Sequence, residues 1–212
     1  YQRKLYFMSF FTLGFFTGLS LILALGAQNI FVIEQGLKKN YIFIVCLICS
    51  ISDLVLIFLG IFLFNYLENY LSGIVEFILN ILLVIFLIYF IFEKIKSNYQ
   101  NVNFNGQQTI LSFKSVIIKT LGFTYLNPHV YSDTVFFLGN FSKNFEIFNK
   151  YYFGLGAAIS SLIFFFLLGY LSKFFSNYLK GEKIWKYINN FIIIFMSCLC
   201  LYIFKDLYNF IV

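Results

Sequence analysis

Residues 5–33, LYFMSFFTLGFFTGLSLILALGAQNIFVI, contain no charged side chain. At about 1.5 Å per residue, a helix of this stretch would reach roughly 43 Å, which exceeds the ~30 Å hydrocarbon core of a bilayer. The surplus length predicts a helix that tilts, breaks or extends into the headgroup region. The stretch therefore predicts a membrane-spanning segment, and it sets the expected class of the whole chain.

The composition supports the same class. The 212 residues are 61% hydrophobic and 11% charged, and their mean hydropathy is +0.86. Soluble domains carry roughly a quarter charged residues, so a water-soluble enzyme, a disordered chain and a free nucleic-acid binder are excluded. The net charge of +6 fits the basic cytoplasmic side of a membrane protein. We expect an integral membrane protein without enzymatic activity.

Five further apolar runs follow the first one, at 41–65, 77–92, 115–139, 151–172 and 187–204. They predict an all-α protein of six transmembrane helices in a single transport domain. Its two three-helix halves, 1–92 and 114–212, are joined by a polar loop over 93–113. A β-barrel is disfavoured, because unbroken apolar stretches such as IFFFLLGYL do not alternate as barrel strands do. Lysines are most frequent in the first, third and fifth connections, which places those connections in the cytoplasm and both termini outside.

Two carboxylates interrupt these apolar runs. Asp53 lies near the centre of the second run and Asp133 lies inside the fourth. A charged group at a helix centre costs about 2.5–3.5 kcal/mol on insertion scales, so each carboxylate needs a partner, a proton, water or a bound cation. His129, the single histidine, precedes Asp133 by four residues and shares its helix face. This pair either relays a proton or orients a cationic ligand, or its two side chains simply hydrogen-bond to each other in the bundle interior.

Two predicted helices carry polar interruptions near their middle. Pro128, the single proline, follows Asn127, a residue typical of helix N-caps, and together they predict that one half-helix ends and another begins. Gly26-Ala27-Gln28-Asn29 is a comparable break in the first run. A broken first helix in each half predicts two inverted repeats with a binding site near the bilayer midplane. Free N–H groups at a half-helix start suit a carboxylate.

Small residues recur at a four-residue spacing in two predicted helices. Gly14 and Gly18 form a G-x-x-x-G pair, and Gly154 and Ala158 form a similar one. Such pairs let two helix backbones approach closely. They predict helix contacts either within the chain or between the two copies of a homodimer.

The four cysteines form two close pairs, of which Cys46-Leu47-Ile48-Cys49 is a C-x-x-C motif. The surrounding sequence is apolar and offers no basic neighbour that would activate a thiol. We therefore interpret these cysteines as small hydrophobic residues rather than as a redox or zinc site. No cofactor and no metal site are expected.

Three longer motifs resemble the lysine exporter (LysE) family, and its arginine-exporter branch in particular. They are LGAQNIFVIEQGLKK (25–39), LICSISDLVLIFLGIF (47–62) and LNPHVYSDTVFFLGN (126–140), in the family's order. The resemblance implies a six-helix, multi-pass exporter of basic amino acids in the bacterial inner membrane, driven by the membrane potential or by proton exchange. Ala27 stands where proline is common in the family, which softens the first break.

The resemblance also implies a substrate-binding set, listed by motif as Gln28 and Asn29; Asp53; and Asn127, His129, Tyr131 and Asp133. Gly26 and Pro128 would break the two helices. We expect half-helix N–H groups near Asn127 and Gln28 to bind the substrate carboxylate, while the two aspartates face its cationic groups. Two alternatives are a divalent-metal exporter using His129 and the aspartates, and a membrane thiol–disulfide carrier using Cys46 and Cys49.

Overall fold

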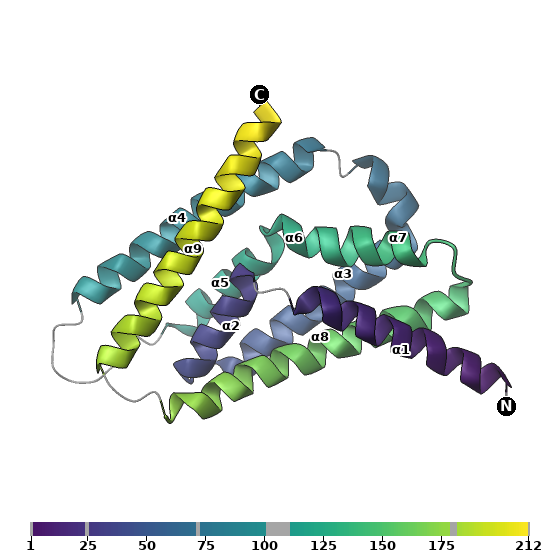
Figure 1. The fold of residues 1–212 in the computed structure, drawn as a ribbon, viewed down its shortest axis with the longest axis horizontal. Coiled ribbons are helices and arrows are strands. Elements are labelled where there is room, and N and C mark those ends of the chain that lie inside the picture. Colours follow the sequence, from purple (N-terminus) through teal and green to yellow (C-terminus); the bar gives the residue numbers. More distant parts are fainter. Residues whose placement is uncertain (1, 24–25, 71–72, 101–110, 179–181, 212) are drawn as a thin grey trace.

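The computed structural model describes residues 2–23, 26–70, 73–100, 111–178 and 182–211. Every regular element in these ranges is a helix, as predicted (Figure 1). In chain order they are α1 (Gln2–Ile22), α2 (Ala27–Leu37), α3 (Ile42–Tyr70), α4 (Gly73–Gln100), α5 (Phe113–Tyr125), α6 (Pro128–Tyr131), the π-helix η1 (Ser132–Phe137), α7 (Leu138–Ser142), α8 (Ile147–Ser176) and α9 (Glu182–Ile211).

The helices extend beyond the apolar runs that predicted them. The clearest case is α4, which continues to Gln100, so the prediction that a loop begins at residue 93 is wrong. Residues 93–100, EKIKSNYQ, contain neither glycine nor proline, and nothing in this polar stretch stops a helix that has already formed. The change to polar residues at 93 shows where α4 leaves the apolar region, but the helix itself continues beyond that point. Most of the predicted loop's remainder, 101–110, lies outside the described residues.

Several of these helices are able to cross a membrane. By length and apolar composition, three helices of the described chain qualify, over Ile42–Phe64, Ile147–Ser176 and Lys186–Lys205. A fourth span results if the bent pair of Ser9–Ile22 and Ala27–Leu37 counts as one. Within α4, the part over Asn80–Phe92 is apolar but shorter. The membrane class is thereby supported, while six complete spans remain a prediction.

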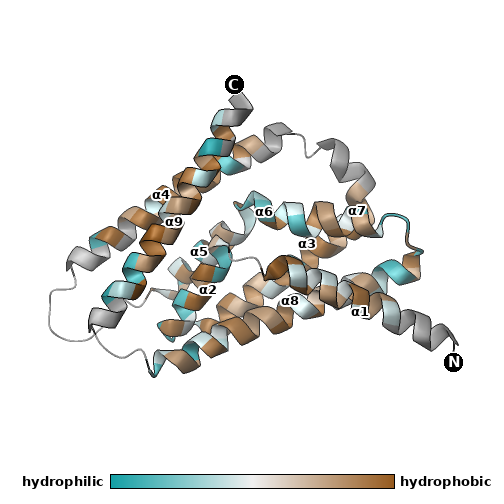
Figure 2. Cartoon of the chain, viewed as in Figure 1, coloured by the Kyte–Doolittle hydropathy of each residue, from teal (hydrophilic) through white to brown (hydrophobic). Residues whose placement is uncertain are grey.

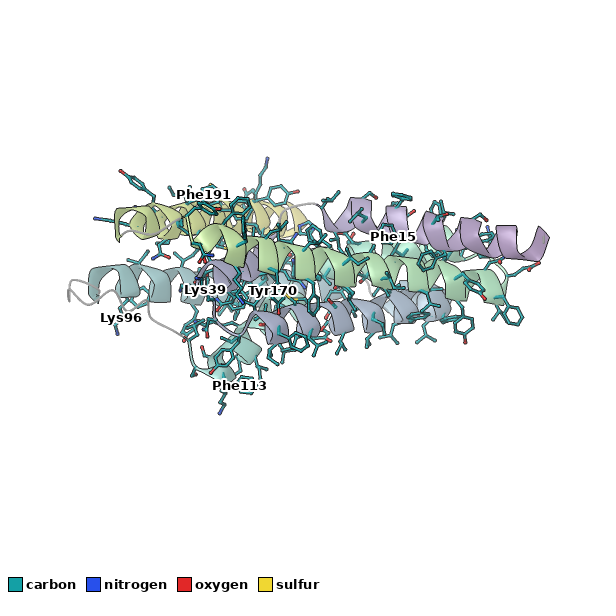
Figure 3. The ribbon with its side chains drawn as sticks, turned by 90° about the horizontal axis from the view of Figure 1, so that it is seen from below. Phe15, Lys39, Lys96, Phe113, Tyr170 and Phe191 are labelled. Atoms are coloured by element: carbon teal, nitrogen blue, oxygen red, sulfur yellow. The ribbon has the colours of Figure 1, made fainter. Side chains whose placement is uncertain are left out.

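The two halves of the chain interlock. The first pair of helices, α1 and α2, packs on α8 from the second half, and α5, η1 and α7 pack on α3 from the first half. Two further helices, α4 and α9, pack against each other along one side of the molecule (Figures 1 and 3). Each broken helix is therefore held by a long helix of the other half.

The small-residue pairs serve contacts within the chain. A Cβ atom built on Gly14 would collide with the backbone carbonyl of Phe153, and one on Gly18 would lie 2.9 Å from the Cα atom of Ala157. The backbones of α1 and α8 thus approach as closely as the G-x-x-x-G spacing predicts. Gly154 faces α3, where its Cβ would lie 3.0 Å from Cδ1 of Ile61. The homodimer, the other predicted use, stays a prediction.

The outer surface is apolar, as expected for a surface in contact with lipid. Hydrophobic residues predominate along the long helices, whereas hydrophilic residues gather at α6 (Figure 2). Large apolar side chains such as Phe113 and Phe191 are exposed on the outside of the bundle (Figure 3). A water-soluble monomer rarely exposes apolar surface on this scale.

Candidate functional site

The first helix break separates α1 from α2. α1 ends at Ile22 and α2 begins at Ala27, and the two helix axes differ in direction by 83°. The side-chain amide of Asn29 donates a hydrogen bond of 3.1 Å to the carbonyl of Ile22, which joins the two arms. Gly26 is the N-cap with φ −113° and ψ −179°, a conformation open to any residue, and no side chain caps α2. The predicted break is confirmed, but it does not depend on glycine flexibility.

The second break separates α5 from α6. The Oδ1 atom of Asn127 accepts a hydrogen bond of 3.1 Å from the backbone N–H of His129, and Pro128 occupies the first turn of α6. This is the cap predicted from the sequence. The Tyr131 hydroxyl donates a 2.9 Å hydrogen bond to the carbonyl of Tyr125, the last residue of α5. Tyr131 thus joins the two sides of the break, and its role at the substrate stays a prediction.

A π-helix follows α6 directly. In η1, the backbone N–H of Leu138 bonds to the carbonyl of Asp133, five residues earlier, and Asp133 itself is half-buried. π-Helical turns are rare and occur frequently at functional sites. η1 packs on α3 at Gly60, where an added Cβ would lie 2.6 Å from Cα of Val135. Glycine at this position lets the helix that carries Asp133 approach the helix that carries Asp53.

The two breaks border one cavity of about 370 Å³. Seven predicted residues line it: Gly26, Gln28, Asn29, Asp53, Asn127, His129 and Asp133. Pro128 and Tyr131 are not among the lining residues. Segments far apart in the sequence thus place both aspartates and both polar interruptions around the same space.

Asp53 is the most deeply buried charged group of the cavity. Its side chain is 2% exposed, and its Oδ2 atom accepts a 2.7 Å hydrogen bond from the Ser161 hydroxyl of α8. Burial of an ionised carboxylate is costly unless hydrogen bonds or a counter-charge stabilise it. Within the described residues, no lysine or arginine lines this cavity. The arrangement suits a cation that enters from outside the protein.

His129 and Asp133 face the same cavity without bonding to each other. Within the described parts of the chain no hydrogen bond or ion pair joins them, although both line the space. His129 is exposed and lies in α6, whereas Asp133 lies in the π-helix. Sharing a helix face, as the four-residue spacing predicts, therefore does not by itself bring the two side chains into a hydrogen bond.

Gln28 offers an additional polar group to the cavity. Its side chain is 6% exposed, and its Nε2 atom makes no hydrogen bond within the described structure. Buried polar groups in native proteins are nearly always hydrogen-bonded, so such a donor beside a cavity indicates room for an acceptor. Its position in the first turn of α2 places it next to the uncapped helix start.

Several cavity residues were not predicted from the sequence. They are Thr134, Phe165, Leu199 and Tyr202, besides the apolar residues of the two breaks; Ser161, which holds Asp53, was also missed. The Ser160-Ser161 pair is a polar interruption in an otherwise apolar run, and this signal could have identified Ser161. Tyr202 carries no such signal, because tyrosine is frequent throughout this chain.

The cysteines behave as small hydrophobic residues. All four thiols are free, and Cys46 and Cys49 are buried in the main core cluster. The Cys46 thiol donates a 3.2 Å hydrogen bond to the carbonyl of Phe165. This contact fixes the thiol against α8 and supports the interpretation made from the sequence.

The chain is similar in sequence to known translocators over most of its length. The sequence model of the LysE type translocators matches residues 19–206. The chain is 32% identical over 190 residues to a putative amino-acid transporter, YggA, of Aeromonas salmonicida, covering 89% of this chain and 92% of the relative. It is 32% identical over 182 residues to the arginine exporter protein ArgO of Escherichia coli K12, covering 85% and 86%. No solved structure matches the chain.

Proposed function

The chain belongs to the LysE type translocator family, and from this membership we propose that it exports basic amino acids, arginine or lysine, across the bacterial inner membrane. Members of this family are transporters and not enzymes. The family-level resemblance found in the sequence is thereby confirmed. The basic substrate is supported by the likeness to an arginine exporter and by the charges of the cavity.

The observation that carries the proposal is the pair of aspartates in one cavity. Asp53 and Asp133 come from different halves of the chain and line the same space, which contains no lysine or arginine among the described residues. Arginine and lysine each carry two cationic groups and one carboxylate. Two carboxylates without a fixed counter-charge favour a ligand with excess positive charge, because that ligand replaces the solvation lost on burial.

The substrate carboxylate has a separate place at the start of α2. α2 begins at Ala27, and its N-cap residue Gly26 makes no side-chain hydrogen bond to the first turn. Nε2 of Gln28, in that turn, is without a hydrogen bond in the described structure. At α6, by contrast, Asn127 already accepts from the N–H of His129. The carboxylate therefore binds at α2 rather than at Asn127.

The reciprocal packing of the two halves supports the proposed inverted repeat. The first broken helix pair packs on α8, and the second broken helix, with its π-helical part, packs on α3. An inverted repeat would relate α3 to α8 and α4 to α9, and the two helices of each pair pack against each other. Alternating access is then a rocking of these units around the central cavity.

Export of a cation needs an energy source. With the cytoplasm negative, moving one positive charge outward is opposed by about 2.3 kcal/mol per 100 mV. Entry of a proton through His129 and Asp133, which line the cavity, would compensate this cost. The proposed transporter is therefore a secondary exporter coupled to protons.

A dipeptide-feeding assay tests the substrate. Cells that lack their own basic amino-acid exporters are fed arginine- or lysine-containing dipeptides, with and without this protein. We expect the protein to raise the rate at which arginine or lysine appears in the medium, while alanine fed in the same way is unaffected. Equal release with and without the protein for both basic amino acids would refute the proposed substrate.

The thiol–disulfide alternative makes a different prediction. We expect a variant with Cys46 and Cys49 changed to alanine, and Cys198 and Cys200 to serine, to keep export within about twofold, because small hydrophobic residues are exchangeable at such sites. The measurement is the same export assay, normalised to the amount of protein in the membrane. A correctly inserted variant that has lost export would support thiol chemistry.

No structural observation favours the divalent-metal alternative. Among the described residues, no group of three or more histidine, cysteine or acidic side chains is placed to hold a metal ion. Growth protection against excess cobalt or nickel, in place of basic-dipeptide export, would nevertheless favour it.

A further inference from the structure

Ser161 forms a buried contact between the two halves of the chain. Its hydroxyl donates a 2.7 Å hydrogen bond to Oδ2 of Asp53, 108 residues away in the sequence. The serine is 0% exposed and the aspartate 2% exposed, so bulk water does not compete for this bond. The contact joins α8 to α3 at the wall of the cavity.

Other helical hydroxyl groups of this chain bond differently. Ser160, the preceding residue, donates a 2.7 Å hydrogen bond to the carbonyl of Ala157 in its own helix. The same local pattern, with an acceptor three or four residues earlier, holds for Ser20, Ser50, Thr120, Thr124, Thr134, Ser142, Ser172 and Ser176. In an apolar helix, the hydroxyl of a serine or threonine usually finds its hydrogen-bond acceptor in this way. Ser161 instead directs its hydroxyl at a carboxylate on another helix.

This bond has a consequence for the cavity side of Asp53. A carboxylate has two oxygens, and the hydroxyl holds Oδ2 against α8. Oδ1 is then the oxygen left for a group in the cavity. A charge-assisted hydrogen bond is stronger and shorter than a neutral one, so it fixes the rotation of the carboxylate group. A charged ligand meets an acceptor that is already oriented, so binding does not include the entropic cost of ordering that side chain.

We propose that Ser161 is a positioning residue that holds the carboxylate of Asp53 for the cationic end of the transported amino acid. The inference rests on the proposed function and deepens it, because it concerns selection of a charged over a neutral side chain. Ser161 acts through Asp53 and does not itself line the cavity. Its contribution therefore exists only while residue 53 carries a negative charge.

Paired affinities for arginine and citrulline test this role, because citrulline has the shape of arginine without the charge. Binding is measured with the full-length protein in detergent, through the ligand-induced rise of the unfolding temperature over a range of ligand concentrations. We expect Ser161→Ala to weaken arginine binding about tenfold and to leave citrulline binding within about twofold. Ser161→Thr, which keeps a hydroxyl, should restore most of the arginine affinity.

Ser160→Ala is the matched control, because Ser160 is equally buried in the same helix and bonds only locally. We expect it to bind both ligands as the wild type does. In an Asp53→Asn background, Ser161→Ala should have no further effect on arginine, since the charge that it positions is absent. This double-variant measurement does not depend on whether threonine fits at position 161.

Two outcomes separate the inference from the function on which it rests. If the wild type does not prefer arginine or lysine to citrulline, the proposed substrate class is wrong and the role of Ser161 falls with it. If the wild type does prefer arginine and Ser161→Ala keeps that preference, the role of Ser161 alone is overturned. The same holds if Ser161→Ala weakens both ligands equally, because that indicates a general structural defect.

Discussion

Replacing Asp53 by asparagine is expected to lower kcat/KM for arginine or lysine export at least a hundredfold. Asparagine keeps the shape of the side chain and can still accept the hydrogen bond from Ser161, so the change removes mainly the charge. A buried charge that loses its partner costs about 3–5 kcal/mol, and each 1.4 kcal/mol is a factor of ten. The measurement is exchange of radiolabelled arginine in proteoliposomes with the purified protein.

Two further acidic positions make this experiment specific. Glu146 precedes α8, is exposed and does not line the cavity, so Glu146→Gln should exchange arginine at the wild-type rate. Asp133 lines the cavity but is only half-buried, so Asp133→Asn should cause a smaller loss than Asp53→Asn. Wild-type exchange by Asp53→Asn would show that charge matching at this residue does not drive substrate binding.

Replacing Gly60 by valine is expected to destabilise the fold by roughly 3 kcal/mol, which lowers the unfolding temperature by about 6–12 °C. A Cβ at this position would lie 2.6 Å from Cα of Val135 and 2.7 Å from the carbonyl oxygen of Thr134. Both are backbone atoms of η1, so no side-chain rotation relieves the clash. The backbones of α3 and η1 must move apart, which also separates Asp53 from Asp133 and should reduce transport.

The buried cysteines provide the measurement for this variant. In a background with Cys198→Ser and Cys200→Ser, a thiol-reactive dye should label Cys46 and Cys49 only as the protein unfolds, because both are buried. Gly26→Ala is the matched control. Among the described residues, its new Cβ would come close only to Nδ2 of Asn127, at 3.9 Å, and its backbone angles suit any residue, so stability should change by less than about 1 kcal/mol. A Gly60→Val protein whose unfolding temperature equals that of the wild type would contradict the proposed close contact.

Features with local causes could be predicted from the sequence. The helix break at Asn127 and Pro128 is one, because a proline lacks the backbone donor of a helix interior and an asparagine caps the next turn. The break before Ala27 was found in the same way, even though the family's usual proline is missing there. The membrane class followed from composition alone, since a chain with so little charge cannot cover its surface with polar groups.

Features that depend on packing could not be predicted in this way. The hydrogen bond from the Tyr131 hydroxyl to the carbonyl of Tyr125, across the second break, is one such feature. His129 and Asp133 line one cavity without a hydrogen bond between them in the described structure, and the π-helix that begins at Ser132 has no counterpart in the sequence-based prediction. No local pattern distinguishes a π-helical turn, because α3 stabilises it from outside through the close approach at Gly60.

A helical membrane protein of the lysine exporter type, the positions of its helix breaks and the acids in apolar surroundings can all be predicted from the order of residues. These properties depend on the solvation of each residue and on the backbone preferences of its neighbours, which are fixed locally. The packing of the helices, by contrast, brings both breaks and both aspartates to one cavity and places the Ser161 hydroxyl against Asp53. The Ser161–Asp53 contact joins residues 108 positions apart, and its geometry comes from how whole helices pack.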